Sequence, residues 1–271
     1  MVSTLQNVTG TIALAGAGKM GGAMLAGWLA GGLDPQRTIV IEPSPSAEIN
    51  ALVAKGIRLN PQDAGTVETL VIAVKPQSFR EAGATLKAHV APSTLVVSIM
   101  AGTPMILLQQ VCGGAVVRAM PNTPAAIGRG ITVAVAAENV SAAQRATADA
   151  LLHAIGSVEW VEDEGLMDAV TAVSGSGPAY VFLLAEELAR AGIAAGLPEA
   201  LATKLARETV AGSGELLRRS DLPSSTLRQN VTSPGGTTAA ALEVLMGKEG
   251  LRQLMTRAIA AATARSKELA K

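Results

Sequence analysis

The N-terminal part of the chain alternates short β-branched runs with helical patterns, and this order limits the possible fold more than any other feature. The apolar runs have the length and composition of strands that are buried on both faces of a sheet. They lie at Thr11–Ala15, Thr38–Ile41, Leu70–Val74, Leu95–Ile99, Ala115–Met120, Ile131–Val135 and Val158–Val161. The segments between them suit crossover helices, at Met20–Ala30, Ser46–Lys55, Ser78–His89, Pro104–Gln110 and Ala142–Ala154. The alternation predicts an α/β fold with a mostly parallel sheet and helices on both of its faces.

Beyond Asp163 the strand pattern stops, and the rest of the chain is helical in pattern. Helices are predicted at Pro178–Ala194, Pro198–Arg218 and Ala239–Lys271. The first of these is apolar nearly all round, which a lone surface helix cannot tolerate. We therefore expect it to be central to its domain or to pack against another chain. The change of pattern predicts two domains, residues 1–163 and residues 164–271.

The 271 residues carry no formal net charge and only 16% of them are charged, so no electrostatic footprint for nucleic acid or an anionic membrane exists. Cys112 is the only cysteine, which excludes an intrachain disulfide and suits a reducing cytoplasm. With His89 and His153 as the only histidines, a His/Cys metal site is close to excluded. The apolar run at residues 12–33 contains Lys19 and many glycines, which argues against a signal or membrane segment. We expect a cytoplasmic protein without a metal.

A glycine-rich loop, Gly16-Ala17-Gly18-Lys19-Met20-Gly21, follows the first predicted strand and opens the first predicted helix. In this context the first glycine permits a tight turn and the second lets the backbone approach a pyrophosphate. The third allows the helix to pack closely on the strand. The loop therefore predicts a dinucleotide site, with an ordinary tight strand–helix turn as the alternative.

Glu42 closes the second predicted strand, about 20 residues beyond the loop, where an acid would hydrogen-bond the ribose hydroxyls of the adenosine. A solvated strand end is the alternative explanation. No Arg or Lys lies between Pro43 and Glu48 to neutralise a 2′-phosphate, although Ser44 and Ser46 could hydrogen-bond one. The local chemistry favours NADH over NADPH.

Two further loops leave the carboxyl ends of predicted strands, where ligands collect in an open α/β sheet. They are Ala73-Val74-Lys75-Pro76 and Ser98-Ile99-Met100-Ala101-Gly102. We expect both to line the pyrophosphate and the nicotinamide. For Lys75 the alternative is an exposed charge before a proline turn.

A glycine pair and several hydroxyls precede the last predicted helix, at residues 230–238. Backbone N–H groups at such a helix start point outward at the positive end of the helix dipole and can hold a small carboxylate. N-capping by Thr237 and Thr238 is the alternative. Together with the glycine-rich loop, this segment predicts a reductase that acts on a small acid.

Several strings of residues carry a resemblance to a known family. They are Gly16-Ala17-Gly18-Lys19-Met20-Gly21, Ala73-Val74-Lys75-Pro76, Arg118-Ala119-Met120-Pro121-Asn122-Thr123-Pro124, Val173-Ser174-Gly175-Ser176-Gly177-Pro178-Ala179-Tyr180 and Val231-Thr232-Ser233-Pro234-Gly235-Gly236-Thr237-Thr238. In this order and spacing they resemble pyrroline-5-carboxylate reductase, the last enzyme of proline synthesis. The last two strings are specific, whereas the first is shared with many dehydrogenases.

The resemblance implies an N-terminal Rossmann-like dinucleotide-binding domain at residues 1–163. An all-α substrate and dimerisation domain follows at residues 164–271. It implies a homodimer, with dimers often joined in a larger ring. The implied reaction is reduction of 1-pyrroline-5-carboxylate to L-proline by NADH or NADPH, at a site between the cofactor domain and the helical dimer. A cyclic iminium is already electrophilic, so positioning over the nicotinamide could supply much of the acceleration.

The resemblance also implies roles for single residues. Carried over, Ile99, Met100, Ala101 and Asn230 lie at the cofactor, Glu164 approaches the substrate, and Thr237 and Thr238 touch its ring or carboxylate. Backbone groups of Ser233, Gly235 and Gly236 would hold the carboxylate, and Thr238 would hydrogen-bond the ring nitrogen as the catalytic residue. The remaining cofactor-binding candidates are Gly16, Ala17, Gly18, Lys19, Met20, Gly21, Glu42, Ser44, Ala73, Val74, Lys75 and Pro76.

Two positions depart from the family. Many relatives have Asn–Arg-like residues where this chain has Glu42-Pro43, and Asp63 stands where an Asn that contacts the ribose often sits. We therefore leave Asp63 out of the site. The alternatives are another two-domain imine or hydroxyacid reductase, and a dinucleotide-binding protein without catalysis. The hydroxyacid type needs a helical lysine followed closely by an asparagine, and Lys204 with Arg207 beyond it offers no such pair.

Overall fold

The structure is a computed structural model that describes residues 5–270. The described chain forms two compact units. The first comprises residues up to Gly175 together with those from Ala262 onward, and the second comprises Ser176–Ala261. Residues 164–175 and 262–270, which we expected in the helical domain, therefore pack in the first unit.

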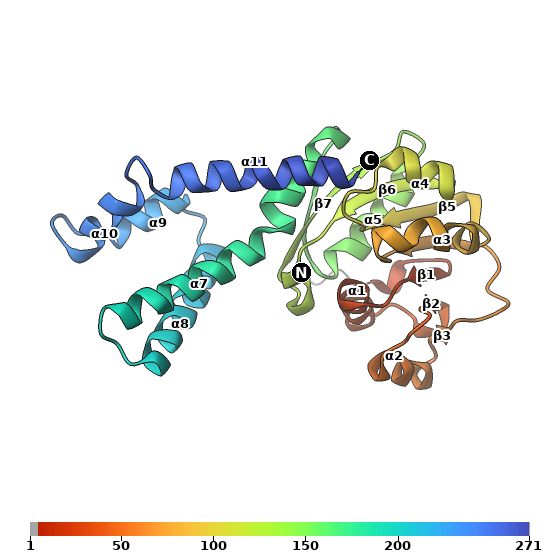
Figure 1. The fold of residues 1–271 in the computed structure, drawn as a ribbon. Helices are drawn as coiled ribbons and strands as arrows, with labels where there is room; N and C mark the ends of the chain where they lie inside the picture. The colour runs from red at the N-terminus through yellow and green to blue at the C-terminus, as the bar shows by residue number, and fades with distance from the viewer. Residues whose placement is uncertain (1–4, 271) are drawn as a thin grey trace. The chain divides into compact units, whose positions relative to one another are not determined.

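The first unit is built on one eight-stranded sheet with the order β3-β2-β1-β4-β5-β6-β7-β8 (Figure 1). Its strands are β1 (Ile12–Ala15), β2 (Thr38–Ile41), β3 (Arg58–Leu59), β4 (Val67–Ile72), β5 (Val90–Ser98), β6 (Ala115–Met120), β7 (Gly130–Ala136) and β8 (Gly156–Trp160). Neighbouring strands are parallel except β6 and β7, which confirms the mostly parallel sheet. Both β2 and β4 pair with β1, so the strand order reverses there. Ligands bind at the carboxyl ends of strands beside such a reversal.

Helices pack on both faces of this sheet, because alternate strand residues point to opposite sides. In β1, Ile12 and Leu14 belong to one buried cluster, whereas Ala13 and Ala15 belong to the other. The first cluster contains residues of α1 (Lys19–Ala30), α2 (Ala47–Ala51) and α5 (Ala142–His153). The second contains residues of α3 (Pro76–Lys87) and α4 (Met105–Val111). The expected Rossmann-like α/β arrangement is thereby confirmed.

Short helical segments and the end of the chain complete the first unit. A 3-10 turn at Glu164–Leu166 leads into α6 (Met167–Val170) and a π-helical turn at Thr171–Gly175. The last helix, α11 (Leu251–Leu269), ends in this unit, where the Ser266 hydroxyl donates to Asp168 Oδ1 at 2.6 Å. The end of α11 therefore packs in the same core as α6, although 98 positions separate Ser266 from Asp168 in sequence.

The second unit is helical, as expected. It contains α7 (Gly177–Ala194), α8 (Glu199–Arg219), α9 (Ser224–Asn230), α10 (Thr237–Leu245) and the first part of α11. Helices α7 and α8 lie side by side (Figure 1), and a Cβ at Gly192 would lie 3.2 Å from the Cβ of Ala202. The single helix predicted at Ala239–Lys271 is wrong in one respect, because α10 ends at Leu245 and α11 begins at Leu251. The chain turns at Gly250, where any Cβ would collide with the Leu245 carbonyl oxygen. Lys271 lies outside the described residues.

Large apolar side chains cover much of this second unit. None of the α7 residues is buried, and Phe182 exposes 68% of its surface. Others on the same helix, including Leu183 and Leu184, expose more than half. Exposed apolar area on this scale marks an interaction surface. Across the described residues, no helix has both the length and the apolar character that a membrane span requires.

Candidate functional site

The glycine-rich loop lies between the carboxyl end of β1 and the start of α1. Gly16 has φ +90°, and a Cβ there would lie 2.7 Å from the Ala73 carbonyl oxygen. A Cβ at Gly21 would collide with the Gly16 carbonyl oxygen. A Cβ at Gly18, by contrast, would meet no atom within 4 Å. The first and third glycines are thus required by the fold, whereas the second leaves open space for a ligand.

Gly18 is also the N-cap of α1, and no side chain caps this helix. The first N–H groups of a helix have no intrahelical partner and favour anions. Lys19 and Met20 open the helix, with the Lys19 side chain exposed. The arrangement fits the pyrophosphate of a dinucleotide.

Glu42, directly after β2, places its carboxylate against this loop. Its Oε2 accepts the Ala17 amide at 2.8 Å, and its Oε1 accepts the Ser44 amide at 3.0 Å. The residue is half-buried, and each carboxylate oxygen retains capacity for another donor. The carboxylate therefore lies against the glycine-rich loop, and its contact with ribose hydroxyls stays a prediction.

A cleft of about 750 Å³ opens beside the glycine-rich loop. Its lining includes the loop residues Ala17, Gly18 and Lys19 and several residues of the segment from Ser46 to Lys55. Sequence reasoning considered only cations close to Glu42 and missed Lys55 as a neighbour of the loop. A cation at the far end of a short helical segment carries no local signal, because only the packing brings it to the cleft.

The loops after β4 and β5 adjoin the glycine-rich loop through the sheet. The Ala73 amide donates to the Ala15 carbonyl oxygen at 2.7 Å, and the Ile99 amide donates to the Ile72 carbonyl oxygen at 3.0 Å. Lys75 is the exposed N-cap of α3, and Pro76 occupies the first turn. Val74 is half-buried, Ile99 and Met100 are buried, and Ala101 is exposed. These candidates thus meet at one edge of the sheet.

Glu164 is held by an ion pair within the first unit. Its Oε1 accepts the Arg118 guanidinium at 2.7 Å and the Met105 amide at 2.8 Å. The Arg118 side chain exposes only 7% of its surface, and that of Glu164 exposes 33%. Met105 begins α4, so the carboxylate also stabilises the positive end of that helix. Sequence reasoning missed this partner, since Arg118 and Glu164 belong to elements that only the fold brings together.

In the second unit, the segment Ser233–Thr238 forms a turn into α10. Gly235 has φ +68°, and Gly236 donates its amide to the Ser233 carbonyl at 3.1 Å. The helix begins at Thr237 with Gly236 as N-cap and no side-chain cap. Capping by Thr237 or Thr238 is therefore wrong, since both lie inside the first turn. Asn230 ends α9 and is exposed.

Comparisons with known proteins bear on both units. Residues 164–269 match the family model described as pyrroline-5-carboxylate reductase dimerisation, and residues 11–102 match one described as NADP oxidoreductase, coenzyme F420-dependent. The pyrroline-5-carboxylate reductase of Synechocystis is 43% identical over 268 residues, which cover 96% of this chain and 98% of the relative. The chain belongs to the pyrroline-5-carboxylate reductase family. The resemblance inferred from the motifs is thereby confirmed.

Other members of the reductase family extend the similarity. The reductase of Pseudomonas aeruginosa is 38% identical, with 97% of each chain covered. The structure of the reductase from Coxiella burnetii superposes with a TM-score of 0.89 at 35% identity, covering 97% of this chain and 99% of that one. A Plasmodium falciparum reductase structure with bound NADP gives a TM-score of 0.79 at 29% identity, covering 96% and 98%.

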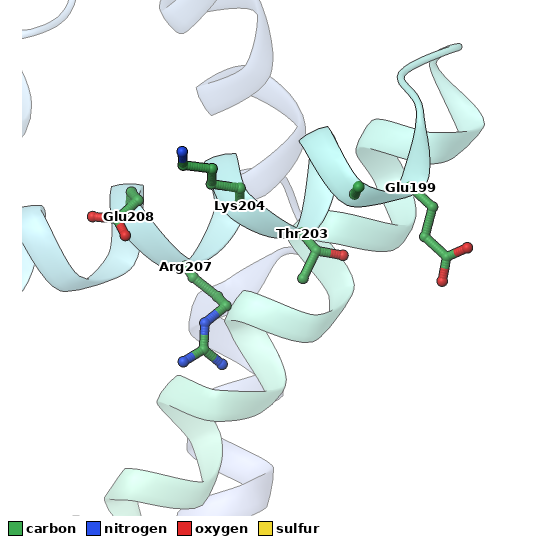
Figure 2. A pocket seen from close by; sticks show the side chains of 6 residues that line it. Glu199, Thr203, Lys204, Arg207 and Glu208 are labelled. Atoms are coloured by element: carbon green, nitrogen blue, oxygen red, sulfur yellow. The ribbon is translucent and has the colours of Figure 1, made fainter.

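The second unit also carries a hollow of about 560 Å³ on α8, and Figure 2 shows side chains that line it. Lys204 and Arg207 lie here with Glu199, Thr203 and Glu208. No asparagine lines the hollow, so the lysine–asparagine pair of the hydroxyacid enzymes is missing here as well. None of the candidate reductase residues lies in it. Among the described residues, no three His, Cys, Asp or Glu side chains are grouped to hold a metal ion.

Proposed function

We propose that this chain reduces 1-pyrroline-5-carboxylate to L-proline with a reduced nicotinamide dinucleotide. The observation that carries the proposal is the similarity to pyrroline-5-carboxylate reductases along nearly the whole chain. The residues fit a dinucleotide, because Gly16 and Gly21 allow a turn that a Cβ would block while Gly18 stays open. When bound, the reduced nicotinamide supplies a hydride for C5 of the protonated imine, whose ring nitrogen already carries a proton.

The candidate cofactor residues then have separate tasks. Amides at Gly18, Lys19 and Met20 hold the pyrophosphate, and the Glu42 carboxylate accepts ribose hydroxyls. The loops at residues 73–76 and 99–101 border the rest of the dinucleotide. Ser44 belongs to the proposed cofactor site because its amide holds the Glu42 carboxylate. Asn230 belongs to it through the family resemblance.

The turn before α10 would hold the substrate. The first amides of α10 and the positive helix end favour a carboxylate; Ser233 and Gly235 are exposed, whereas Gly236 is half-buried and its amide is bonded to Ser233. The Thr238 hydroxyl would hydrogen-bond the ring nitrogen and so fix the imine for attack at C5. Thr237 would contact the carboxylate. For Glu164 we propose contact with the substrate through Oε2, because Oε1 is engaged by Arg118 and Met105.

For the cofactor we propose a preference for NADH. The Glu42 carboxylate would accept both ribose hydroxyls, whereas a 2′-phosphate would bring two like charges together. One observation favours NADPH instead: Lys19 and Lys55 line the adjacent cleft and could neutralise a 2′-phosphate. A measured NADPH preference of about tenfold, worth ~1.4 kcal/mol, would overturn the preference for NADH.

We further propose a homodimer formed through the second unit, and a ring of such dimers as the larger assembly. The exposed apolar residues of α7 support the dimer, because a monomer in water would leave them unpaired. We also propose a cytoplasmic location, which the single buried Cys112 supports.

One assay tests the reaction and the cofactor together. The absorbance of NADH and of NADPH is followed separately with pyrroline-5-carboxylate, and oxidation dependent on the imine is expected. Hydroxyisobutyrate-like acids with the oxidised cofactors are the comparison. Turnover of those acids without reduction of the imine would overturn the proposal, as would cofactor binding without turnover.

A further inference from the structure

Asn60 has a backbone conformation that no other described residue except glycine adopts. Its φ is +48°, in the left-handed region, which the short polar side chain of Asn tolerates better than most. It follows β3 directly, at the edge of the sheet and at the carboxyl end of the strands. The chain therefore turns away from β2 at this residue.

Beyond the end of β3, the Asn60 side chain makes the hydrogen bonds to the β2 segment that a strand backbone would otherwise make. In the parallel register of β2 and β3, Ile39 pairs with Arg58 and Val40 pairs with Leu59. Beyond it, the Asn60 amide donates to the Val40 carbonyl at 2.8 Å. The side-chain Oδ1 accepts the Glu42 amide at 2.9 Å, and Nδ2 donates to the Glu42 carbonyl at 2.9 Å. A side-chain amide thus serves the Glu42 backbone as a neighbouring strand would.

The consequence is that Glu42 is fixed at both ends. Its backbone is held by Asn60, and its carboxylate is held by the amides of Ala17 and Ser44. A longer Gln side chain would not keep this spacing, and an Asp would lose the donor to the Glu42 carbonyl. A residue needed only to join β3 to β2 would require its backbone amide and not its side chain.

We propose that Asn60 is a positioning residue for cofactor choice, because it fixes the backbone from which the Glu42 carboxylate reaches the glycine-rich loop. Fixed there, the carboxylate accepts the ribose hydroxyls of NADH and repels the 2′-phosphate of NADPH. The role of Asn60 rests on the proposed role of Glu42 in cofactor choice. A free Glu42 could rotate into solvent, which would weaken NADH binding and relieve the repulsion of NADPH.

The test uses four forms of the full-length protein: the wild type, Asn60→Gly, Glu42→Ala and the double variant. Glycine keeps the left-handed backbone conformation and removes only the side-chain amide. Dissociation constants of NADH and NADPH are measured separately by nicotinamide fluorescence, without substrate. Asn50→Ala is the matched control, because the Asn50 side chain donates its hydrogen bonds to the carbonyls of Pro45 and Ser46 and not to Glu42.

We expect Asn60→Gly to shift the ratio of the two dissociation constants by about fivefold or more towards NADPH. In the Glu42→Ala background the same substitution should leave the ratio unchanged, because its effect passes through Glu42. Asn50→Ala should not change the ratio. Equal weakening of both cofactors by Asn60→Gly, or a shift that persists without Glu42, would overturn the role of Asn60.

These outcomes can be told apart from those that test the other proposals. The wild-type ratio tests the NADH preference by itself, and the imine assay tests the reaction. A wild-type preference for NADPH would reject the NADH assignment, while the shift caused by Asn60→Gly would still report on Asn60. Failure of imine reduction would leave all the binding measurements valid.

Discussion

The Arg118 guanidinium donates to Glu164 Oε1 at 2.7 Å, and the same oxygen accepts the first amide of α4. The bond joins β6 to the 3-10 turn that precedes α6. Because the Arg118 side chain is almost completely buried, its charge has little water to replace a lost partner. The pair therefore matters to stability whether or not Glu164 also meets the substrate.

Glu164→Ala should lower the free energy of unfolding by about 3 kcal/mol, because it leaves a buried charge unpaired. Glu164→Gln should cost less, since the amide oxygen can still accept both bonds. Urea denaturation at a fixed protein concentration measures the change. The control is Glu162→Gln, whose side chain is 90% exposed and lies 3.7 Å from Arg145. If Glu162→Gln and Glu164→Ala lowered the free energy of unfolding equally, burial of Arg118 would not explain the effect.

Substitutions in the glycine-rich loop should separate folding from binding. Gly16→Ala should destabilise the protein by about 1–3 kcal/mol, because φ is positive and the Cβ meets the Ala73 carbonyl. Gly18→Ala should lower the melting temperature less than Gly16→Ala, since its Cβ points into open space and only the N-cap of α1 is weakened. It should nevertheless weaken both cofactors by about tenfold, because the backbone can no longer approach the pyrophosphate. Thermal unfolding and cofactor titration measure the two effects. Full cofactor affinity in Gly18→Ala would place the pyrophosphate elsewhere.

Thr238→Ala should lower kcat/KM for the imine by at least about tenfold, ~1.4 kcal/mol, with little change in cofactor affinity. The hydroxyl is not needed as a cap, so its loss should not disturb α10. Thr147→Ala is a suitable control, because that hydroxyl bonds only the Ala143 carbonyl within α5. Steady-state kinetics and cofactor titration check the outcome. An unchanged kcat/KM would remove Thr238 from the site.

The double substitution Phe182→Ser with Leu184→Ser should weaken the dimer. These two exposed residues lie on different sides of α7, so at least one should meet a partner that packs against the helix. Light scattering after size-exclusion chromatography would then show a smaller particle at low protein concentration. Arg190→Gln, which removes two exposed ion pairs within the same helix, is the control. An unchanged mass at all concentrations would contradict a dimer through α7.

Burial raises the pKa of the Cys112 thiol from 9.0 to about 11, and the Lys87 charge opposes this rise. The thiol should therefore resist iodoacetamide at pH 8 in the native protein and react once urea unfolds it. Between pH 9 and 11 the unfolded state releases this proton while the folded state keeps it, so stability falls as pH rises. Cys112→Ala should make the decline over that range shallower. Rapid native labelling at pH 8 would show that the thiol is accessible.

The parts of the fold that the sequence predicts are those with a periodic pattern. Buried strands such as β1 and long helices such as α7 show it clearly. The two-residue strand at Arg58–Leu59 and the short helix α9 are too brief to show a period. The break between α10 and α11 depends on a turn at Gly250, and a single glycine is compatible with either a continuous or an interrupted helix.

The same distinction applies to the candidate site. Glu42 is predictable because strand spacing places an acid at the end of β2. Asn60, Lys55 and Arg118 lie beside Glu42, the glycine-rich loop and Glu164 only through strand order and helix packing, so no local pattern identifies them. Positive φ at Asn60 is likewise a property of the folded chain. Pairwise contacts across the sheet are the information that a single sequence lacks.

The end of α11 belongs to the unit that holds the glycine-rich loop, where Ser266 bonds Asp168 and Leu269 adjoins Gly102. During synthesis the ribosome releases the sheet long before these residues emerge from the exit tunnel. The core of the N-terminal unit therefore stays incomplete until the whole helical unit has been translated. The core of the dinucleotide half is thus completed only by residues that lie after the helical unit in the sequence.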